Sequence, residues 1–105
     1  MISEARLGGD GVAIADVTLW EIAMLVTRGR VKLPHSLGAF LRHLEETFHI
    51  LPVNGDIAER SMLFTESYPK DPTDRIIGAI ALAHGIPLVT ADSKILASKE
   101  VPCIW

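Results

Sequence analysis

Apolar residues along this chain gather in two kinds of run, and each kind predicts a different element. Short runs that are apolar almost without interruption, such as GVAIADV at residues 11–17, are typical of strands buried on both faces. Longer runs with apolar positions three and four apart, such as Leu37, Leu41 and Leu44, predict amphipathic helices. We therefore expect strands over residues 11–17, 49–53, 86–92 and 101–105, and helices over residues 19–29, 35–48, 55–67, 71–85 and 92–98.

Residues at the ends of these runs mark where helices start. Thr18 with Glu21 three residues later has the capping-box pattern, so we expect Thr18 to cap the helix over 19–29. Asp71 directly before Pro72 has the pattern of an N-cap with proline at the first helical position. Both helices are therefore expected to carry an acid close to their start.

The helix expected over 55–67 leaves two details open. Either Asn54 or Asp56 can cap it, because both side chains accept hydrogen bonds from backbone N–H groups. Either Ser61 or Met62 can continue its inward face.

Strands that alternate with helices indicate an α/β protein with a mainly parallel sheet covered on both sides. The chain has 105 residues, no internal repeat and no linker, so we expect one domain over residues 1–105. About ten residues precede the first expected strand, which is too few for a further strand-helix unit.

Composition excludes several classes of protein. A net charge of −3 is unlike the basicity of a protein that coats nucleic acid. The single cysteine, Cys103, permits no internal disulfide and no cysteine-rich zinc site. No apolar run approaches the roughly 20 residues of a membrane span, and the start MISEARLGGDG lacks the order of a signal peptide. We expect a cytoplasmic protein with no membrane partner.

Four acids are expected at one edge of the sheet. Sites in open parallel sheets form beyond the carboxyl ends of the strands. Glu21 follows the first expected strand, Asp92 ends the third, and Asp71 and Asp74 start the helix that precedes the third. Clustered carboxylates repel one another unless a cation neutralises them, and Mg²⁺ prefers oxygen ligands. The pattern predicts a divalent-metal site that activates water for phosphodiester cleavage.

Each acid also has a purely structural use. Asp71 is better explained as an N-cap, while Asp74 suits the helix dipole and a metal about equally well. Glu21 fits the capping box, and Asp92 can cap the short helix behind it. Agreement of all four on one edge favours the metal site. Small residues one and two turns after Asp74, Gly78 and Ala81, suggest that this helix face is kept open.

Two other features have competing interpretations. Arg28, Arg30 and Lys32 form a basic cluster, which is either a solvated helix end, the favoured reading, or a patch that contacts RNA phosphates. Trp20 and Trp105 are better explained as core or interface anchors than as platforms for stacked bases.

Three segments in order, LWEIAMLVTRGRVKLP, ILPV and DPTDRIIGAIALAHGIPLVTAD, resemble the PIN-domain ribonucleases, most of all the VapC toxins of bacterial toxin–antitoxin pairs. The resemblance runs from about Gly11 to the C-terminus. It implies a three-layer α/β/α sandwich, RNA cleavage with Mg²⁺ or Mn²⁺, an antitoxin partner and a homodimer. By motif it assigns the metal and catalytic roles to Glu21, Asp74 and Asp92. Asp71 and Thr90 are supporting residues.

The chain departs from the family pattern at its start. Family members open with a strand that carries an aspartate, a principal metal ligand, followed by one or two helices. This chain begins roughly where those helices would end, and neither Asp10 nor Asp16 matches that aspartate. We therefore expect the sheet to lack the family's first, central strand. A start site assigned too far downstream, a truncated remnant, and a partner that supplies the strand are three open explanations.

The sequence thus leads to a first hypothesis, a metal-dependent endoribonuclease of the VapC type, impaired if it is truncated. The alternative is a non-catalytic PIN remnant, a protein-binding or oligomerisation module that binds an antitoxin or an intact toxin subunit through the apolar helices around residues 19–26 and 37–48. A third, weaker hypothesis is another phosphotransfer enzyme built on an acid cluster.

Overall fold

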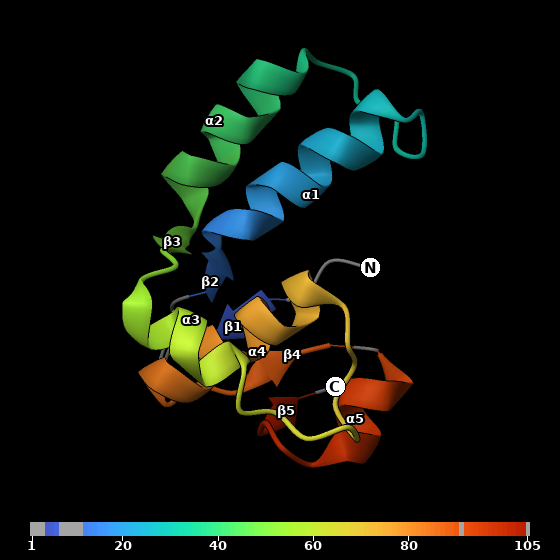
Figure 1. Cartoon of the computed structure of the whole chain (residues 1–105). Helices are drawn as coiled ribbons and strands as arrows, with labels where there is room; N and C mark the ends of the chain where they lie inside the picture. The colour runs from blue at the N-terminus through green and yellow to red at the C-terminus, as the bar shows by residue number, and fades with distance from the viewer. Residues whose placement is uncertain (1–3, 7–11, 91, 105) are drawn as a thin grey trace.

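A five-stranded sheet with helices packed against it forms the centre of the molecule, which confirms the expected α/β class (Figure 1). The structure is a computed structural model and describes residues 4–6, 12–90 and 92–104. The strands are β1 (Glu4–Arg6), β2 (Val12–Ala15), β3 (His49–Leu51), β4 (Leu88–Val89) and β5 (Cys103–Ile104). The helices are α1 (Asp16–Thr27), α2 (Leu37–Thr47), α3 (Gly55–Ser61), α4 (Pro72–His84) and α5 (Ser93–Ser98).

The sheet has the order β3-β2-β1-β4-β5. β2 pairs with β3 and β4 pairs with β5 in parallel, so four strands run in one direction, as expected. β1 was not predicted. It lies in the middle of the sheet, antiparallel to both neighbours, with Ala5 opposite Ala13 and Leu88. Antiparallel strands need only a short turn between them, whereas parallel strands need a long crossover. A reversed strand therefore fits where a strand-helix unit does not.

The start of α1 differs from the prediction. The helix begins at Asp16, so Ala15 rather than Thr18 is its N-cap, and the expected capping box is wrong. Thr18 is buried, and its hydroxyl has no hydrogen-bond partner among the described residues. The Asp16 carboxylate accepts a hydrogen bond of 3.1 Å from the backbone N–H of Val53. This bond ties the start of α1, directly after β2, to the segment that follows β3. Asp10 lies outside the described residues.

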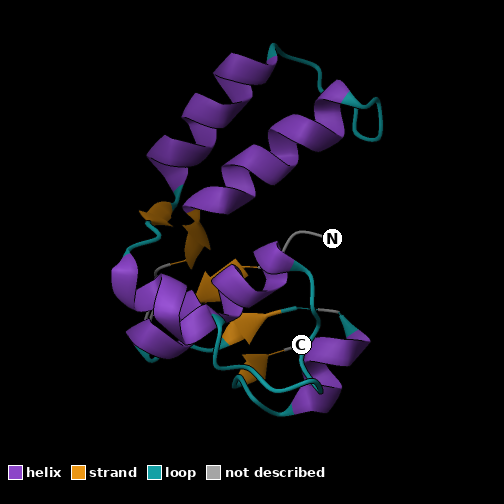
Figure 2. Ribbon diagram, viewed as in Figure 1, coloured by secondary structure: helices purple, strands orange, loops and turns teal. Residues whose placement is uncertain are grey.

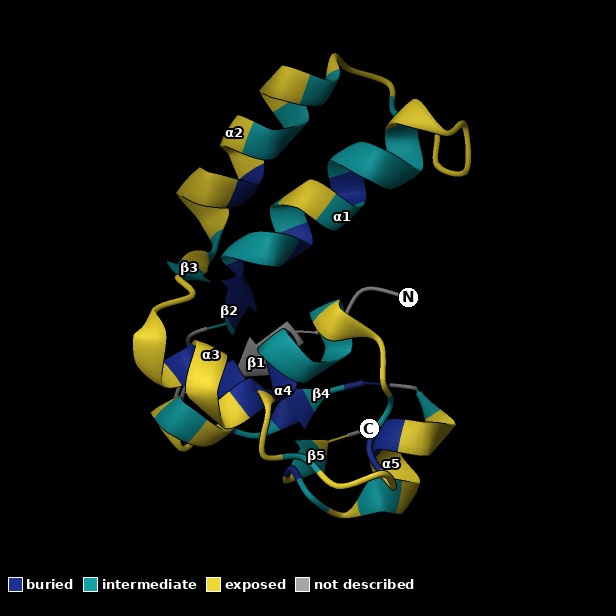
Figure 3. Ribbon diagram, viewed as in Figure 1, coloured by how far each residue is buried: buried dark blue, intermediate teal, exposed yellow. Residues whose placement is uncertain are grey.

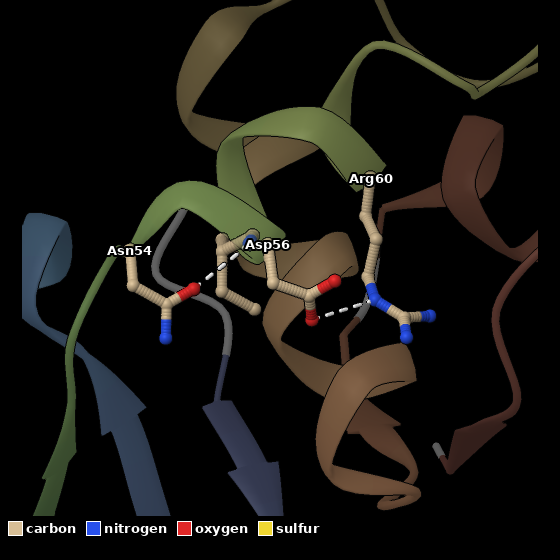
Figure 4. Close-up of polar contacts among 4 residues, drawn as sticks. Asn54, Asp56 and Arg60 are labelled. Atoms are coloured by element: carbon tan, nitrogen blue, oxygen red, sulfur yellow. Dashed lines mark hydrogen bonds and ion pairs between the residues drawn. The ribbon is translucent and has the colours of Figure 1, made fainter.

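Both open details of α3 are settled by its contacts. Asn54 is the N-cap, because its Oδ1 accepts a 3.0 Å hydrogen bond from the N–H of Ile57, whereas Asp56 forms a 2.9 Å ion pair with Arg60 (Figure 4). Ser61 continues the inward face and is buried, while Met62 is 79% exposed. The helix ends at Ser61 and not at residue 67 as expected.

Hydrogen bonds from side chains outside α3 explain this early end, because they satisfy backbone groups of the 62–70 loop. The Arg75 guanidinium donates hydrogen bonds of 2.9–3.4 Å to four carbonyl oxygens, those of Phe64, Thr65, Tyr68 and Pro69. The Glu100 carboxylate accepts from the N–H and hydroxyl of Thr65 and from the hydroxyl of Ser67. Polar groups satisfied in this way do not need a helix.

The hydrophobic core centres on α4, whose residues from Ile77 to Ala81 are all buried. They pack with side chains from the strands, α3 and α5, including Ile57, Leu88 and Ile95. The helices α1 and α2 instead extend away from the strands as a pair, which we call the arm (residues 16–47; Figure 2). No helix in the described part of the chain is both long and apolar enough to cross a membrane.

Candidate functional site

An acidic pocket of about 570 Å³ lies where α4 and α5 begin. Asp71 and Asp74 line it from the start of α4, and Asp92 lines it from the start of α5. Three of the four acids predicted for this edge are therefore brought together. The remaining wall comes from Pro69, Lys70, Ser93 and Lys94.

Asp71 is the N-cap of α4, which confirms the favoured interpretation. Its Oδ1 accepts hydrogen bonds of 2.9 Å from the N–H of Thr73 and 2.6 Å from the Thr73 hydroxyl, with Pro72 at the first helical position. These bonds, led by that from the hydroxyl, lower the pKa of Asp71. The carboxylate of Asp71 is thus already well satisfied by its own helix.

Asp74, one turn further along α4, is in the opposite situation. It is half-buried, and no hydrogen bond from a described residue reaches its carboxylate. Burial is the main cause that raises the pKa of Asp74, followed by the negative charges of Asp71 and Asp92. A carboxylate that is desolvated, unpaired and surrounded by like charges favours binding of either a proton or a cation.

Glu21 approaches the same helix start from α1. Its Oε2 accepts a 3.3 Å hydrogen bond from the Thr73 hydroxyl, while its Oε1 is buried and has no partner in residues 12–90 and 92–104. Burial raises the pKa of Glu21 most strongly; the Thr73 hydrogen bond lowers it, and the charges of Asp74 and Asp71 raise it again. Glu21 therefore does not cap α1; its carboxylate instead interacts electrostatically with that of Asp74.

Asp92 caps α5 and lines the pocket as well. Its Oδ1 accepts hydrogen bonds of 2.9 Å from the N–H of Lys94 and 3.1 Å from the N–H of Ile95. The buried Thr90 holds Asp92 from the other side, because its Oγ1 accepts a 3.1 Å hydrogen bond from the N–H of Asp92. Thr90 therefore fixes the backbone that carries the third acid.

These residues can bind a hard divalent cation, but only with few protein ligands. In the part of the chain that the structure describes, no three His, Cys, Asp or Glu side chains lie close enough to hold one ion together. Glu21 Oε1 and the Asp74 carboxylate nevertheless accept no hydrogen bond from the described residues, so both are available as metal-ligating oxygens. Mg²⁺ commonly uses only one or two carboxylates and keeps several waters.

The small face of α4 has a different use from the one predicted. A Cβ on Gly78 would lie 2.9 Å from Cζ of Tyr68 and 3.0 Å from Cζ of Phe64, so the Tyr68 ring fills the space. The Tyr68 hydroxyl donates a 2.8 Å hydrogen bond to the backbone oxygen of Asp74. The glycine therefore makes room for a buried tyrosine and does not open the helix to a ligand.

The predicted basic cluster is not brought to the pocket. Arg28, Arg30 and Lys32 are exposed in the connection between α1 and α2, at the end of the arm away from α5 (Figure 1). Their contact with RNA stays a prediction. The pocket instead has two lysines that sequence reasoning missed, Lys70 and Lys94. The available signal was their position, one residue before Asp71 and two after Asp92.

Comparison with known proteins adds a family and two relatives. The family model described as PIN domain matches residues 1–100. Ribonuclease VapC22 of Mycobacterium tuberculosis (strain ATCC 25618 / H37Rv) is 31% identical over 98 residues, which are 93% of this chain and 75% of that protein. A chain of a toxin-antitoxin complex from Klebsiella pneumoniae has a similar structure, with a TM-score of 0.65 and 28% sequence identity over 84% of this chain and 68% of that chain. These matches confirm the resemblance seen in the sequence motifs.

Proposed function

Since this chain belongs to the PIN-domain family, we propose that it is an endoribonuclease toxin of the VapC type that needs Mg²⁺ or Mn²⁺. The observation that carries the proposal is the state of Asp74, a half-buried carboxylate that accepts no hydrogen bond from any described residue and lies next to the charges of Glu21 and Asp92. A ribonuclease relative and a relative from a toxin-antitoxin complex support the reaction class.

In this proposal Asp74 and Asp92 would be the main ligands of the cation, and Glu21 on α1 would add its negative charge beside them. The bound ion would activate a water molecule and stabilise the charge that builds up on the phosphate. Glu21 would act on the ion and its water through the negative charge of its carboxylate beside Asp74, while the Thr73 hydroxyl holds one of its oxygens. Thr90 keeps Asp92 in place, and Asp71 supports the site by holding the start of α4.

Partners follow from the same family membership. We propose a cognate antitoxin that restrains the enzyme, a homodimer, and a cytoplasmic location in which both meet RNA. The arm is the surface that we assign to protein contacts, because Trp20 on it is 58% exposed and most apolar side chains of α1 are only half-buried. A helix whose apolar side chains are incompletely covered offers an apolar surface of the kind that protein partners bind.

The variants Asp74→Asn and Asp71→Asn test whether Asp74 is the metal ligand. Both make the same change on the same helix, one at the proposed ligand and the other at the N-cap. Asn caps a helix as well as Asp does, so D71N should keep the helix start and lose less than about threefold in rate. D74N should reduce Mn²⁺-dependent cleavage of a mixed RNA pool by about 100-fold, since the ion contributes several kcal/mol to the transition state.

Calorimetry with Mn²⁺ alone should show weaker binding to D74N than to D71N. Unchanged cleavage by D74N would rule out the assignment of Asp74. Cleavage absent from the unaltered protein, together with no Mn²⁺ binding, would instead favour the non-catalytic binding module.

A further inference from the structure

We propose that Lys70 and Lys94 are the residues that bind the RNA phosphates, and that the RNA strand runs from the acidic pocket across this pair into a second pocket beside it. This inference rests on the proposed ribonuclease function and adds the path of the substrate. It replaces the basic cluster at the end of the arm as the main phosphate contact.

The two pockets meet at the lysines. The second pocket, of about 360 Å³, is lined by Glu66, Ser67, Tyr68, Pro69, Lys70 and Lys94. Pro69, Lys70 and Lys94 therefore line both pockets, and the lysines stand at the boundary between them. A volume of this size is in the range that holds a small organic group, so a nucleotide next to the cleaved bond fits beside a phosphate held at the boundary.

Both lysine side chains are free to bind an anion. Within the described ranges the single ion pair is that between Arg60 and Asp56, although Lys70 and Lys94 share a pocket with three aspartates. Both lysines are exposed. An ammonium that is not paired internally can neutralise a phosphate without first breaking a salt bridge.

The charge of the pocket makes the lysines necessary. Among the residues that the structure describes, the three aspartates and two lysines that line the acidic pocket have a formal charge of −1, which would repel RNA. A divalent cation changes this charge to +1. Without the lysines the charge would be −3, and the cation would raise it only to −1. The lysines therefore decide whether the loaded pocket attracts or repels a phosphate.

The backbone under each lysine is held by the groups that shape the site. The N–H of Lys94 donates to Asp92, so this lysine is tied to a proposed metal ligand. Lys70 ends the 62–70 loop, whose backbone is fixed by four hydrogen bonds from Arg75 and by those to Glu100. A phosphate-binding group on fixed backbone loses less conformational freedom on binding.

The test measures RNA binding separately from cleavage. A labelled, cleavage-resistant single-stranded RNA analogue is titrated with the protein in Mn²⁺ at several monovalent salt concentrations, so that the pocket holds its cation and the strand stays intact. Each phosphate contact on a single strand contributes about −0.7 to the slope of log K against log salt concentration. The double variant K70Q/K94Q should therefore make the slope less steep by about 1.4, whereas R42Q/K99Q, two exposed cations elsewhere, should leave it unchanged.

Cleavage with Mn²⁺ supplies a second readout. K70Q/K94Q should raise KM at least tenfold with kcat within about threefold, because binding is weakened before the chemical step. Equal melting temperatures would exclude a folding defect. A slope that stays unchanged in K70Q/K94Q, or that falls instead in R28Q/R30Q, would overturn the inference while leaving a D74N-sensitive nuclease intact. If D74N has no effect on cleavage but the lysine variant changes the slope, the proposed metal site fails and the phosphate pair stands.

Discussion

The helices α1 and α4 have similar apolar runs but opposite surroundings. Five consecutive residues of α4 are buried, whereas of the twelve residues of α1 only Thr18 and Ile22 are buried (Figure 3). α4 lies among the strands, α3 and the Tyr68 ring, while α1 has α2 beside it and meets the rest of the molecule at its start. An apolar helix is thus a core element in one case and an incompletely covered surface in the other.

The candidate site lies at the junction of these two regions. Glu21 on the arm accepts a hydrogen bond from Thr73 on α4, and Asp16 at the foot of α1 accepts one from Val53. The arm also brings the negative charge of Glu21 close to Asp71 and Asp74, and these like charges repel one another. The site therefore depends on how firmly the arm is held against the body.

The largest contrast is expected for truncated apolar side chains. Ile80→Ala on α4 removes a side chain that is 1% exposed and should lower the free energy of unfolding by about 2–5 kcal/mol. Leu25→Ala on α1 removes a half-buried side chain and should cost less than about 1 kcal/mol. Urea unfolding of both variants measures the difference. Equal losses would mean that the arm is as firmly packed as the core.

A smaller effect, on association and not on folding, is expected for Trp20→Ser. The side chain is 58% exposed, so its removal should change the free energy of unfolding by less than about 1 kcal/mol. Exposed tryptophans at interfaces commonly contribute about 2 kcal/mol, so the self-association constant from sedimentation should fall by at least tenfold. L63S, on the body, is a matched control because Leu63 is 74% exposed. If W20S associates as the unaltered protein does, the arm is not the contact surface.

The smallest effect is expected for Glu21→Gln at the junction. Burial raises the pKa of Glu21, so the folded chain holds this proton more tightly than the unfolded chain does. The contribution of this proton to the free energy of unfolding is complete below the ordinary pKa of glutamate, and it is lost as pH rises through the raised pKa. E21Q removes that loss and should raise the melting temperature in EDTA at pH 7 but not below about pH 4. A gain that is equal at every pH would contradict the electrostatic explanation.

The sequence predicted the α/β class, the start of α4 and the common pocket of Asp71, Asp74 and Asp92 correctly. The Asp71–Pro72 start of α4 depends on hydrogen bonds within three residues, so the sequence shows it directly. The shared edge of Asp74 and Asp92 followed from the α/β alternation alone.

Long-range contacts explain what the sequence did not show. The 62–70 loop is fixed by Glu100, a residue 35 positions from Thr65, and no local pattern announces that bond. Thr18 with Glu21 has a valid capping pattern, but Glu21 makes its hydrogen bond with Thr73, 52 positions away. The reversed strand β1 has no signal of its own in the sequence, because its three residues, Glu4–Arg6, form no apolar run.

The packing of Tyr68 against Gly78 has a practical consequence. Tyr68 is the chain's only tyrosine, it is 1% exposed, and its hydroxyl is bonded to the backbone of Asp74. Burial raises its pKa above the usual tyrosine range. Its phenolate absorbance is therefore a native spectroscopic reporter of the site, silent at ordinary alkaline pH while the start of α4 is intact and visible as soon as that packing is lost.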